Sequence, residues 1–210
     1  MTSLGLRAIR LEDDADAWRS AGFDVARDGA VHLSGLRVEL ERDDATGWSW
    51  WSDEDRTGDI DAIVTTWVTE PPPPAAAHPI GRIGVDHVVL RSPDLDRTTS
   101  AFEGLGIACR RVRDVGSDEK PFQQRFFRVG PVILELVGDP SSSSEGPASI
   151  WGLALTVDDL DTAVARLGPA CGRAKDAVQP GRRIATVRTT DLGISLPVAL
   201  MSPDPRRSRS

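Results

Sequence analysis

Hydrophobic and polar positions follow nearly the same pattern in two parts of the chain. Residues 84–106 read GVDHVVLRSPDLDRTTSAFEGLG, and residues 150–168 read IWGLALTVDDLDTAVARLG. In both segments an apolar run typical of a buried strand is followed by apolar residues at helical spacing. Asp94 and Asp159 are suited to cap the first helical turn, and Gly106 and Gly168 follow the last one. The pattern therefore predicts a strand and then a helix in each segment.

Strand-like sequence follows each predicted helix. Residues 122–138 read FQQRFFRVGPVILELVG and residues 182–201 read RRIATVRTTDLGISLPVALM, each interrupted by a turn that contains glycine. Each repeat is thus predicted to be a β-α-β-β-β module, the first over residues 81–139 and the second over residues 149–203. The two modules together define a predicted domain over residues 81–203.

The N-terminal part of the chain has a weaker version of the same pattern. Residues 1–70 contain a strand, a short helix after an aspartate, and further strands around glycine turns, which predicts a degenerate βαβββ-like segment. It is a third module, a lid or a dimerisation element. Residues 71–80 form a proline-rich linker, since prolines favour polyproline II, and His78 within it is expected to face solvent. Residues 204–210 are expected to be a basic, disordered tail.

Composition excludes several classes of partner. The formal net charge is −7 and the isoelectric point is about 5.0, which argues against binding to nucleic acid or to an anionic membrane. No apolar run reaches the length of a membrane span or a signal peptide, so a cytoplasmic protein is expected. Cys109 and Cys171 are too few for a disulfide framework.

The two modules resemble the vicinal oxygen chelate superfamily, which includes glyoxalases, bleomycin-resistance proteins and dioxygenases. The similarity lies in the openings DHVVL and PDLD and the closing VILELVG, and the segments WGLALTVDDLD and QPGRRIATVR are similar to glyoxalase-like proteins of the actinobacterial type. The resemblance implies an α+β fold in which paired modules form a cupped, incompletely closed barrel around a ligand cavity. It also implies metal ligands on the first and last strands of each module.

Only the first module has side chains suited to this metal site. The resemblance places His87 on its first strand and Glu135 on its last strand, and an imidazole with a carboxylate suits a divalent metal ion. In the second module the same positions are Gly152 and Pro197, which cannot bind a metal. Two ligands are fewer than the three that catalytic sites of this type supply. The cofactor is therefore unknown, a divalent metal or, as we favour, none.

His87 and Glu135 have alternative roles. They are the candidate catalytic residues, as an acid–base couple or as metal ligands, and a metal-free role lining the pocket or a purely structural role is also open. His32 and Glu39 are the other pair of suitable type in strand-like sequence, and one of them would complete a metal site if the N-terminal segment packed across the cup.

Further pocket residues are expected on the neighbouring strand and hairpin. Strand alternation places Gln124 and Phe126 on one face of residues 122–129, and Gln123, Arg125 and Phe127 on the other. We assign Gln124 and Phe126 to ligand binding. Arg182 and Arg183 follow a Pro-Gly turn, where an arginine either binds a ligand carboxylate or stays solvated.

Three tryptophans lie close together in the N-terminal segment. Trp48 and Trp50 would share one face of a strand and Trp51 the other. An exposed aromatic cluster marks a lid or an interface, whereas a buried one would cover the open side of the barrel as the segment folds onto it.

Three functions are compatible with these residues. The favoured one is a glyoxalase-like protein that binds a small molecule in the cup without a complete metal site. The second is an enzyme of the superfamily, a lyase, isomerase or dioxygenase, using His87 and Glu135 with or without a divalent metal. The third is an interaction or regulatory protein with a vestigial cup. A homodimer is a further expectation.

Overall fold

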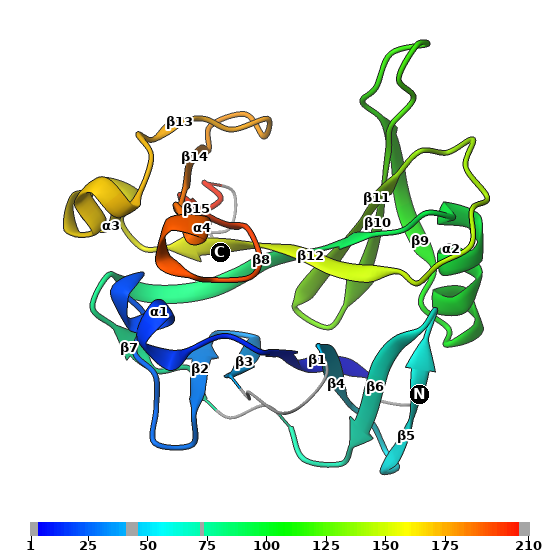
Figure 1. Ribbon diagram of the computed structural model, residues 1–210, viewed down its shortest axis with the longest axis horizontal. Coiled ribbons are helices and arrows are strands. Elements are labelled where there is room, and N and C mark those ends of the chain that lie inside the picture. Colours follow the sequence, from blue (N-terminus) through cyan, green and yellow to red (C-terminus); the bar gives the residue numbers. More distant parts are fainter. Residues whose placement is uncertain (1–3, 41–45, 72–73, 206–210) are drawn as a thin grey trace.

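Two β-sheets stacked in layers make up the protein. The computed structural model describes residues 4–40, 46–71 and 74–205. In Figure 1 the N-terminal sheet lies below, strands β8 and β12 cross the middle, and the remaining C-terminal strands rise above them. Most of the predicted basic tail, residues 206–210, and residues 72–73 of the predicted linker lie outside the described residues.

The C-terminal sheet has the strand order β13-β14-β15-β12-β8-β11-β10-β9, with β7 also paired to β8. The first strands of the two modules, β8 and β12, are antiparallel neighbours. Each is also parallel to the last strand of its own module, β8 to β11 and β12 to β15. This is the predicted pairing of β-α-β-β-β modules in an α+β fold, so the predicted fold class is confirmed. The strand bounds are β7 (Ala77–His78), β8 (Gly81–Arg91), β9 (Cys109–Asp114), β10 (Gln123–Val129), β11 (Val132–Gly138), β12 (Ser149–Val157), β13 (Lys175–Asp176), β14 (Arg183–Thr186) and β15 (Val198–Met201).

The two predicted helices are present with their predicted caps. The Asp94 carboxylate accepts a hydrogen bond from the backbone N–H of Arg97 (2.9 Å) at the start of α2 (Leu95–Gly104). Asp159 does the same for Thr162 (3.0 Å) at the start of α3 (Leu160–Leu167). These bonds satisfy amide groups that have no partner within the helix. Short helical turns, η1 (Gly168–Ala170) and α4 (Thr189–Leu192), follow in the second module.

The N-terminal sheet repeats the same pairing in shortened form. Its order is β2-β3-β1-β4-β6-β5, in which β1 is parallel to β3, β4 is parallel to β6, and β1 and β4 are antiparallel neighbours. A helix, α1 (Ala15–Ser20), follows β1, but no helix occurs between β4 and β5 in the described chain. The segment thus resembles two truncated modules, whereas the sequence suggested one degenerate copy. The strand bounds are β1 (Gly5–Leu11), β2 (Ala30–Leu33), β3 (Leu36–Leu40), β4 (Gly47–Trp51), β5 (Arg56–Ile60) and β6 (Ile63–Val68).

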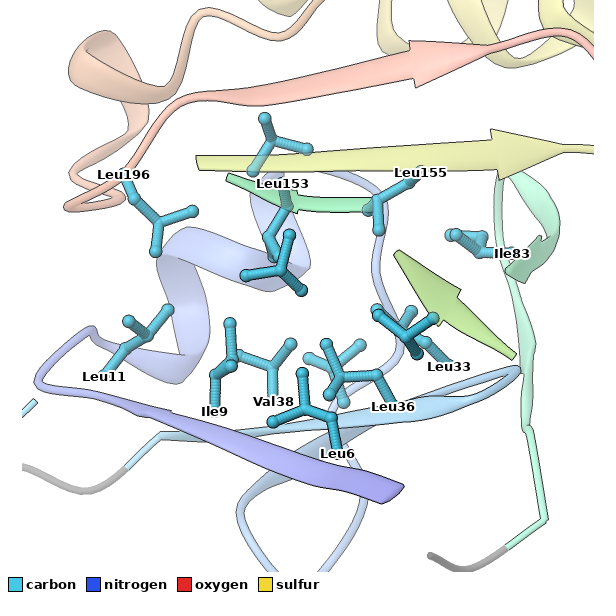
Figure 2. Close-up of a cluster of buried hydrophobic side chains, with 14 of the residues drawn as sticks. Leu6, Ile9, Leu11, Leu33, Leu36, Val38, Ile83, Leu153, Leu155 and Leu196 are labelled. Carbon is cyan, nitrogen blue, oxygen red and sulfur yellow. The ribbon is translucent and has the colours of Figure 1, made fainter. Parts of the chain in front are cut away.

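A shared apolar core joins the two sheets. Figure 2 shows leucine and isoleucine side chains of the N-terminal sheet meeting Leu153 and Leu155 of β12 and Ile83 of β8. Strand alternation turns Ala154 to the other face of β12, and Ala154 pairs with His87. The N-terminal sheet therefore covers one face of the C-terminal sheet, and His87 lies on the opposite face.

The tryptophan cluster belongs to this core. Trp48 and Trp50 are fully buried, and their ring centroids are 5.1 Å apart. The ring centroids of Trp48 and Phe102 of α2 are 6.2 Å apart. The interpretation of these two residues as an exposed lid or interface is wrong. They also do not cover the open side of the cup, because they pack on the helix-bearing face of the sheet. Trp51 is only half-buried, and its indole N–H donates to the backbone carbonyl of Thr69 (3.1 Å).

His78 is buried, contrary to the expectation of a solvent-facing linker residue. Its Nδ1 accepts a hydrogen bond from the backbone N–H of Asp24 (3.1 Å), and its Nε2 lies 3.1 Å from the backbone carbonyl of His32. This end of the linker is held because β7 pairs with β8 and places the imidazole against Phe23. None of the described helices has the length and apolar character needed to cross a membrane.

Candidate functional site

A cavity of about 520 Å³ lies on the face of the C-terminal sheet opposite the N-terminal sheet. Strands β9, β10 and β11 of the first module form one wall, and the β13–β14 region of the second module faces them, as the two raised arms in Figure 1 show. The cavity is therefore built between the two modules, where the resemblance implied a ligand site. Its lining residues include Asp86, His87, Gln124, Phe126, Ile133 and Glu135.

A β-bulge in β8 turns two consecutive polar side chains into this cavity. Ala154 pairs with His87, but the next residue of β12, Leu155, pairs with Val85, so Asp86 is an extra residue without a partner in the ladder. A bulge breaks the alternation of side chains and re-aims the residues beside it. As a result both Asp86 and His87 line the cavity. Asp86 was missed in the sequence, where an aspartate directly before His87 in an apolar strand was the available signal.

Four polar side chains form a continuous chain of contacts on the cavity wall. His87 Nδ1 lies 2.9 Å from Asp86 Oδ2, and His87 Nε2 lies 3.1 Å from Glu135 Oε2. The Gln124 side-chain amide donates to the other oxygen of Glu135. Glu135 is only 8% exposed, so these neighbours replace most of the water that would solvate its carboxylate.

Asp86 is held as an anion by hydrogen bonds from two neighbours, His87 and Arg182. Burial alone would raise its pKa, but hydrogen bonds from His87 and Arg182, together with the charge of Arg182, outweigh burial and lower the pKa to about 2. Arg182 Nη1 lies 2.6 Å from Asp86 Oδ1, and Arg182 Nε donates to the Ser202 carbonyl (3.0 Å). This ion pair links the first strand of one module to the hairpin of the other.

The anionic Asp86 determines how His87 shares its protons. A carboxylate can only accept, so Nδ1 must donate to Asp86, and Nε2 faces Glu135. The ring is then either an imidazolium between two carboxylates or a neutral imidazole that accepts from a protonated Glu135. In both states one proton lies on the contact between Nε2 and Oε2. The pair can therefore donate that proton to a bound molecule or accept a proton from it.

The residues present do not fit the three-ligand metal site of the resemblance. Gly152 and Pro197 are neighbours, since a Cβ added at Gly152 would lie 3.2 Å from the Pro197 carbonyl oxygen. Neither residue has a side chain that can bind a metal ion. Among the described residues no group of three or more His, Cys, Asp and Glu side chains is arranged to hold a metal ion. The direct contact between His87 and Glu135 satisfies both groups within the chain itself.

His32 and Glu39 do not complete the site, and that prediction is wrong. Glu39 is paired with Arg7 (3.2 Å) and Arg37 (3.3 Å) on the N-terminal sheet. His32 Nε2 is 3.0 Å from an Asp28 oxygen. Neither lines the cavity, because their sheet packs against the opposite face of β8 and β12.

The structure brings together some of the predicted pocket residues. Gln124 and Phe126 line the cavity, while Arg125 of the alternate face pairs with Asp96 (2.7 Å) beside α2. Arg182 is buried behind the cavity wall on Asp86. Arg183 pairs with Asp161 of α3 (2.7 Å) and lies outside the cavity lining.

Cavity-lining arginines were missed in the sequence. Arg110, Arg111 and Arg113 of β9 and Arg128 of β10 all line the cavity. The available signal is the segment CRRVRD, residues 109–114, whose strand pattern is weak because it has few apolar residues.

Comparison with known proteins agrees with the fold. The family model of the Glyoxalase/Bleomycin resistance protein/Dioxygenase superfamily matches residues 84–190, just over half of the chain. The chain therefore belongs to this superfamily, and the resemblance to vicinal oxygen chelate proteins is confirmed. Its assignment to the actinobacterial glyoxalase-like type stays a prediction. None of the curated proteins compared with the chain matches it.

Two solved structures with TM-scores above 0.6 show the same fold at low sequence identity. A mutant of 4-hydroxymandelate synthase from Streptomyces coelicolor is 14% identical with a TM-score of 0.63, covering 96% of this chain and 93% of that chain. A xylose isomerase-like TIM barrel/4-hydroxyphenylpyruvate dioxygenase fusion protein is 14% identical with a TM-score of 0.62, covering 94% and 48%. Methylmalonyl-CoA epimerase from Mycobacterium tuberculosis is 22% identical with a TM-score of 0.44, covering 60% and 92%. The first two similarities extend across the N-terminal sheet.

Proposed function

We propose that this protein binds a small organic molecule in the cavity between its two modules, using its own side chains and no metal ion. The observation behind the proposal is the direct contact between His87 Nε2 and Glu135 Oε2. His87 Nδ1 contacts Asp86, and the other oxygen of Glu135 accepts from Gln124, so the polar atoms of both side chains already have partners in the chain. A cavity of about 520 Å³ is also within the usual range for small-molecule sites, roughly 300–1,000 Å³.

The metal part of the proposal is tested by elemental analysis of the purified protein and of its His87→Ala variant. We expect far less than one equivalent of any transition metal in both proteins, and a melting temperature that does not change with a chelator. About one equivalent of metal in the native protein, lost in the His87→Ala variant, would overturn the metal-free proposal.

The binding part is tested with a fragment library followed by ligand-detected NMR. Ala177→Trp serves as the blocked control, because Ala177 lines the cavity and a large ring there fills it. Fragments that bind the native protein should lose their signal in this variant. Binding that is the same in both proteins would place the ligand elsewhere and overturn the proposal.

The orientation of His87 supports a second candidate function, proton transfer by an isomerase or lyase. Asp86 holds the ring so that Nε2 shares a proton with Glu135 at the cavity surface. Such a pair removes a proton from a carbon next to a carbonyl and returns one from solvent. Incubation of 2-oxobutyrate and phenylpyruvate in D₂O would then show exchange of the acidic C–H by NMR. The exchange should disappear in Glu135→Gln, and no exchange above the buffer rate in the native protein counts against this function.

The interaction or regulatory alternative loses its proposed surface, because Trp48 and Trp50 are buried in the core. A homodimer stays a prediction, to be measured by sedimentation equilibrium.

A further inference from the structure

Four arginines share one wall of the cavity. Arg111 lies opposite Phe126 and Arg113 lies opposite Gln124 in the β9–β10 ladder, so both face the cavity with their partners. A register shift between Phe126 and Phe127 makes Arg110 an extra residue, and it also lines the cavity. Arg128 adds a fourth guanidinium from the same face of β10.

These guanidinium groups have no anionic partner within the described chain. No hydrogen bond or ion pair joins the side chains of Arg110, Arg111, Arg113 or Arg128 to another described residue. Among the other described arginines, seven are paired with carboxylates: Arg7, Arg19, Arg37, Arg97, Arg125, Arg182 and Arg183. Arg110, Arg111, Arg113 and Arg128 differ from the remaining unpaired arginines because they line one cavity together. Cations are thus gathered without partners in a protein whose net charge is −7.

The carboxylates of the cavity are engaged elsewhere. Glu135 contacts His87 and Gln124, and Asp86 contacts His87 and Arg182. Arg110, Arg111 and Arg128 are exposed and Arg113 is half-buried. Like charges on neighbouring strand positions repel one another, and an anion among these side chains would relieve that repulsion. An arginine fork matches the oxygens of a carboxylate or a phosphate.

The rest of the lining is mostly apolar. Phe126 and Ile133 lie beside the arginines, and Val178, Ile184 and Met201 face them from the second module. Val178 is 74% exposed, which leaves apolar surface at the cavity mouth without a partner. A ligand that matches both the arginines and the apolar lining has an acidic group at one end and an apolar body.

We infer that the cavity selects a small organic anion, whose carboxylate or phosphate is bound by Arg110, Arg111, Arg113 and Arg128. Its apolar body then lies on Phe126 and Ile133, next to the contact between His87 and Glu135. This inference rests on the proposed function, since it names the class of ligand for the same cavity.

The test compares a charged probe with its neutral isostere by isothermal titration calorimetry. The probes are 4-phenylbutyrate, phenyl phosphate and 4-phenylbutyramide, with inorganic phosphate as an anion that lacks an apolar body. We expect at least one organic anion to bind about tenfold or more tightly than the amide, because a charge-assisted hydrogen bond is stronger than a neutral one. The preference should weaken as salt is added.

The double variant Arg111→Gln, Arg113→Gln should lose this preference and still bind the amide as the native protein does. Arg27→Gln is the control, because Arg27 is exposed in the N-terminal segment and does not line the cavity. Loss of unpaired cations should not lower the melting temperature, so reduced binding would not reflect unfolding.

The outcomes separate the two proposals. Equal binding of the acids and the amide, or a preference that survives in the double variant, overturns the anion inference and leaves small-molecule binding in place. Inorganic phosphate that binds as tightly as phenyl phosphate overturns the role of the apolar wall. Failure of every probe, together with a fragment screen in which no signal depends on the cavity, overturns the proposed function itself.

Discussion

At the scale of single residues, the ion pair between the partly buried Asp86 and the buried Arg182 connects the site to the second module. Arg182 is 6% exposed, and its guanidinium contacts Asp86, Gln179 and the Ser202 carbonyl. The pair orients His87 through Asp86 and also ties the second module to β8. Its contribution to stability can be measured by mutation.

Asp86→Asn should lower the free energy of unfolding by about 3 kcal/mol, because it leaves the buried Arg182 without its anion. Urea denaturation at pH 7 measures the change. Arg183→Gln removes the neighbouring exposed pair with Asp161 and should leave stability nearly unchanged. Equal losses in the two variants would show that burial of the Asp86 pair is not the cause.

The pH dependence of stability should follow from His78. Burial lowers the pKa of this histidine below its ordinary value of 6.5, despite its hydrogen bond to the His32 carbonyl and the nearby Asp24. The unfolded chain therefore takes up a proton more readily than the native protein, and stability falls as the pH drops below 6.5. In His78→Gln this loss between pH 7 and pH 5 should be smaller. An identical pH profile in both proteins would contradict this prediction.

At the scale of elements, the turn between β5 and β6 joins the two sheets under backbone strain. Asp61 and Ala62 have φ of 49° and 65°, a region that side chains with a Cβ disfavour. Asp61 also pairs with Arg97 of α2 (2.5 Å) and contacts Thr98. The strain is maintained because the turn presents Asp61 to α2.

Ala62→Gly should raise the free energy of unfolding by about 1 kcal/mol, since glycine adopts this backbone without a steric penalty. Thermal and urea unfolding measure it. Ala174→Gly is the matched control, because Ala174 is absent from the positive-φ residues of the described chain, and it should not be stabilising. A decrease in the Ala62 variant would show that strain is not relieved there.

At the scale of the whole molecule, the two sheets share one core and should unfold together. Trp48 lies on β4 and contacts Phe102 of α2 at 6.2 Å. Trp48→Ala should cost about 3–5 kcal/mol and keep a single unfolding transition, because the cavity it leaves adjoins both sheets. Trp51→Ala, at a half-buried position, should cost less. Two separate transitions in the native protein would indicate that the sheets are independent.

The two-module domain could be predicted because its signals are local. Asp94 and Asp159 cap helices within three residues, and the apolar runs of β8 and β12 need only alternation to be recognised. The pairing of His87 with Glu135 was also predictable, since the family resemblance fixes which strands lie side by side. Glu135 and His87 indeed meet at 3.1 Å.

Other features depended on contacts between distant segments. Asp86 faces the cavity only because a β-bulge forms where β8 pairs with β12, and strict alternation would place it on the other face. Arg182 was predicted to bind a ligand or stay solvated, but Asp86 binds it across 96 residues of sequence. His78 is buried because β7 pairs with β8, although its proline-rich neighbours suggested exposure.

The sequence by itself determined the repeat, the caps, the superfamily and the lack of metal-binding side chains at Gly152 and Pro197, because each depends on neighbouring residues or on single side chains. The tertiary structure decided which face of the sheet the N-terminal segment covers, and which charges find partners. Those outcomes depend on strand register and on burial between segments far apart in the chain. For that reason the arginines of β9 and β10 come together in one cavity lining only when the sheet is formed.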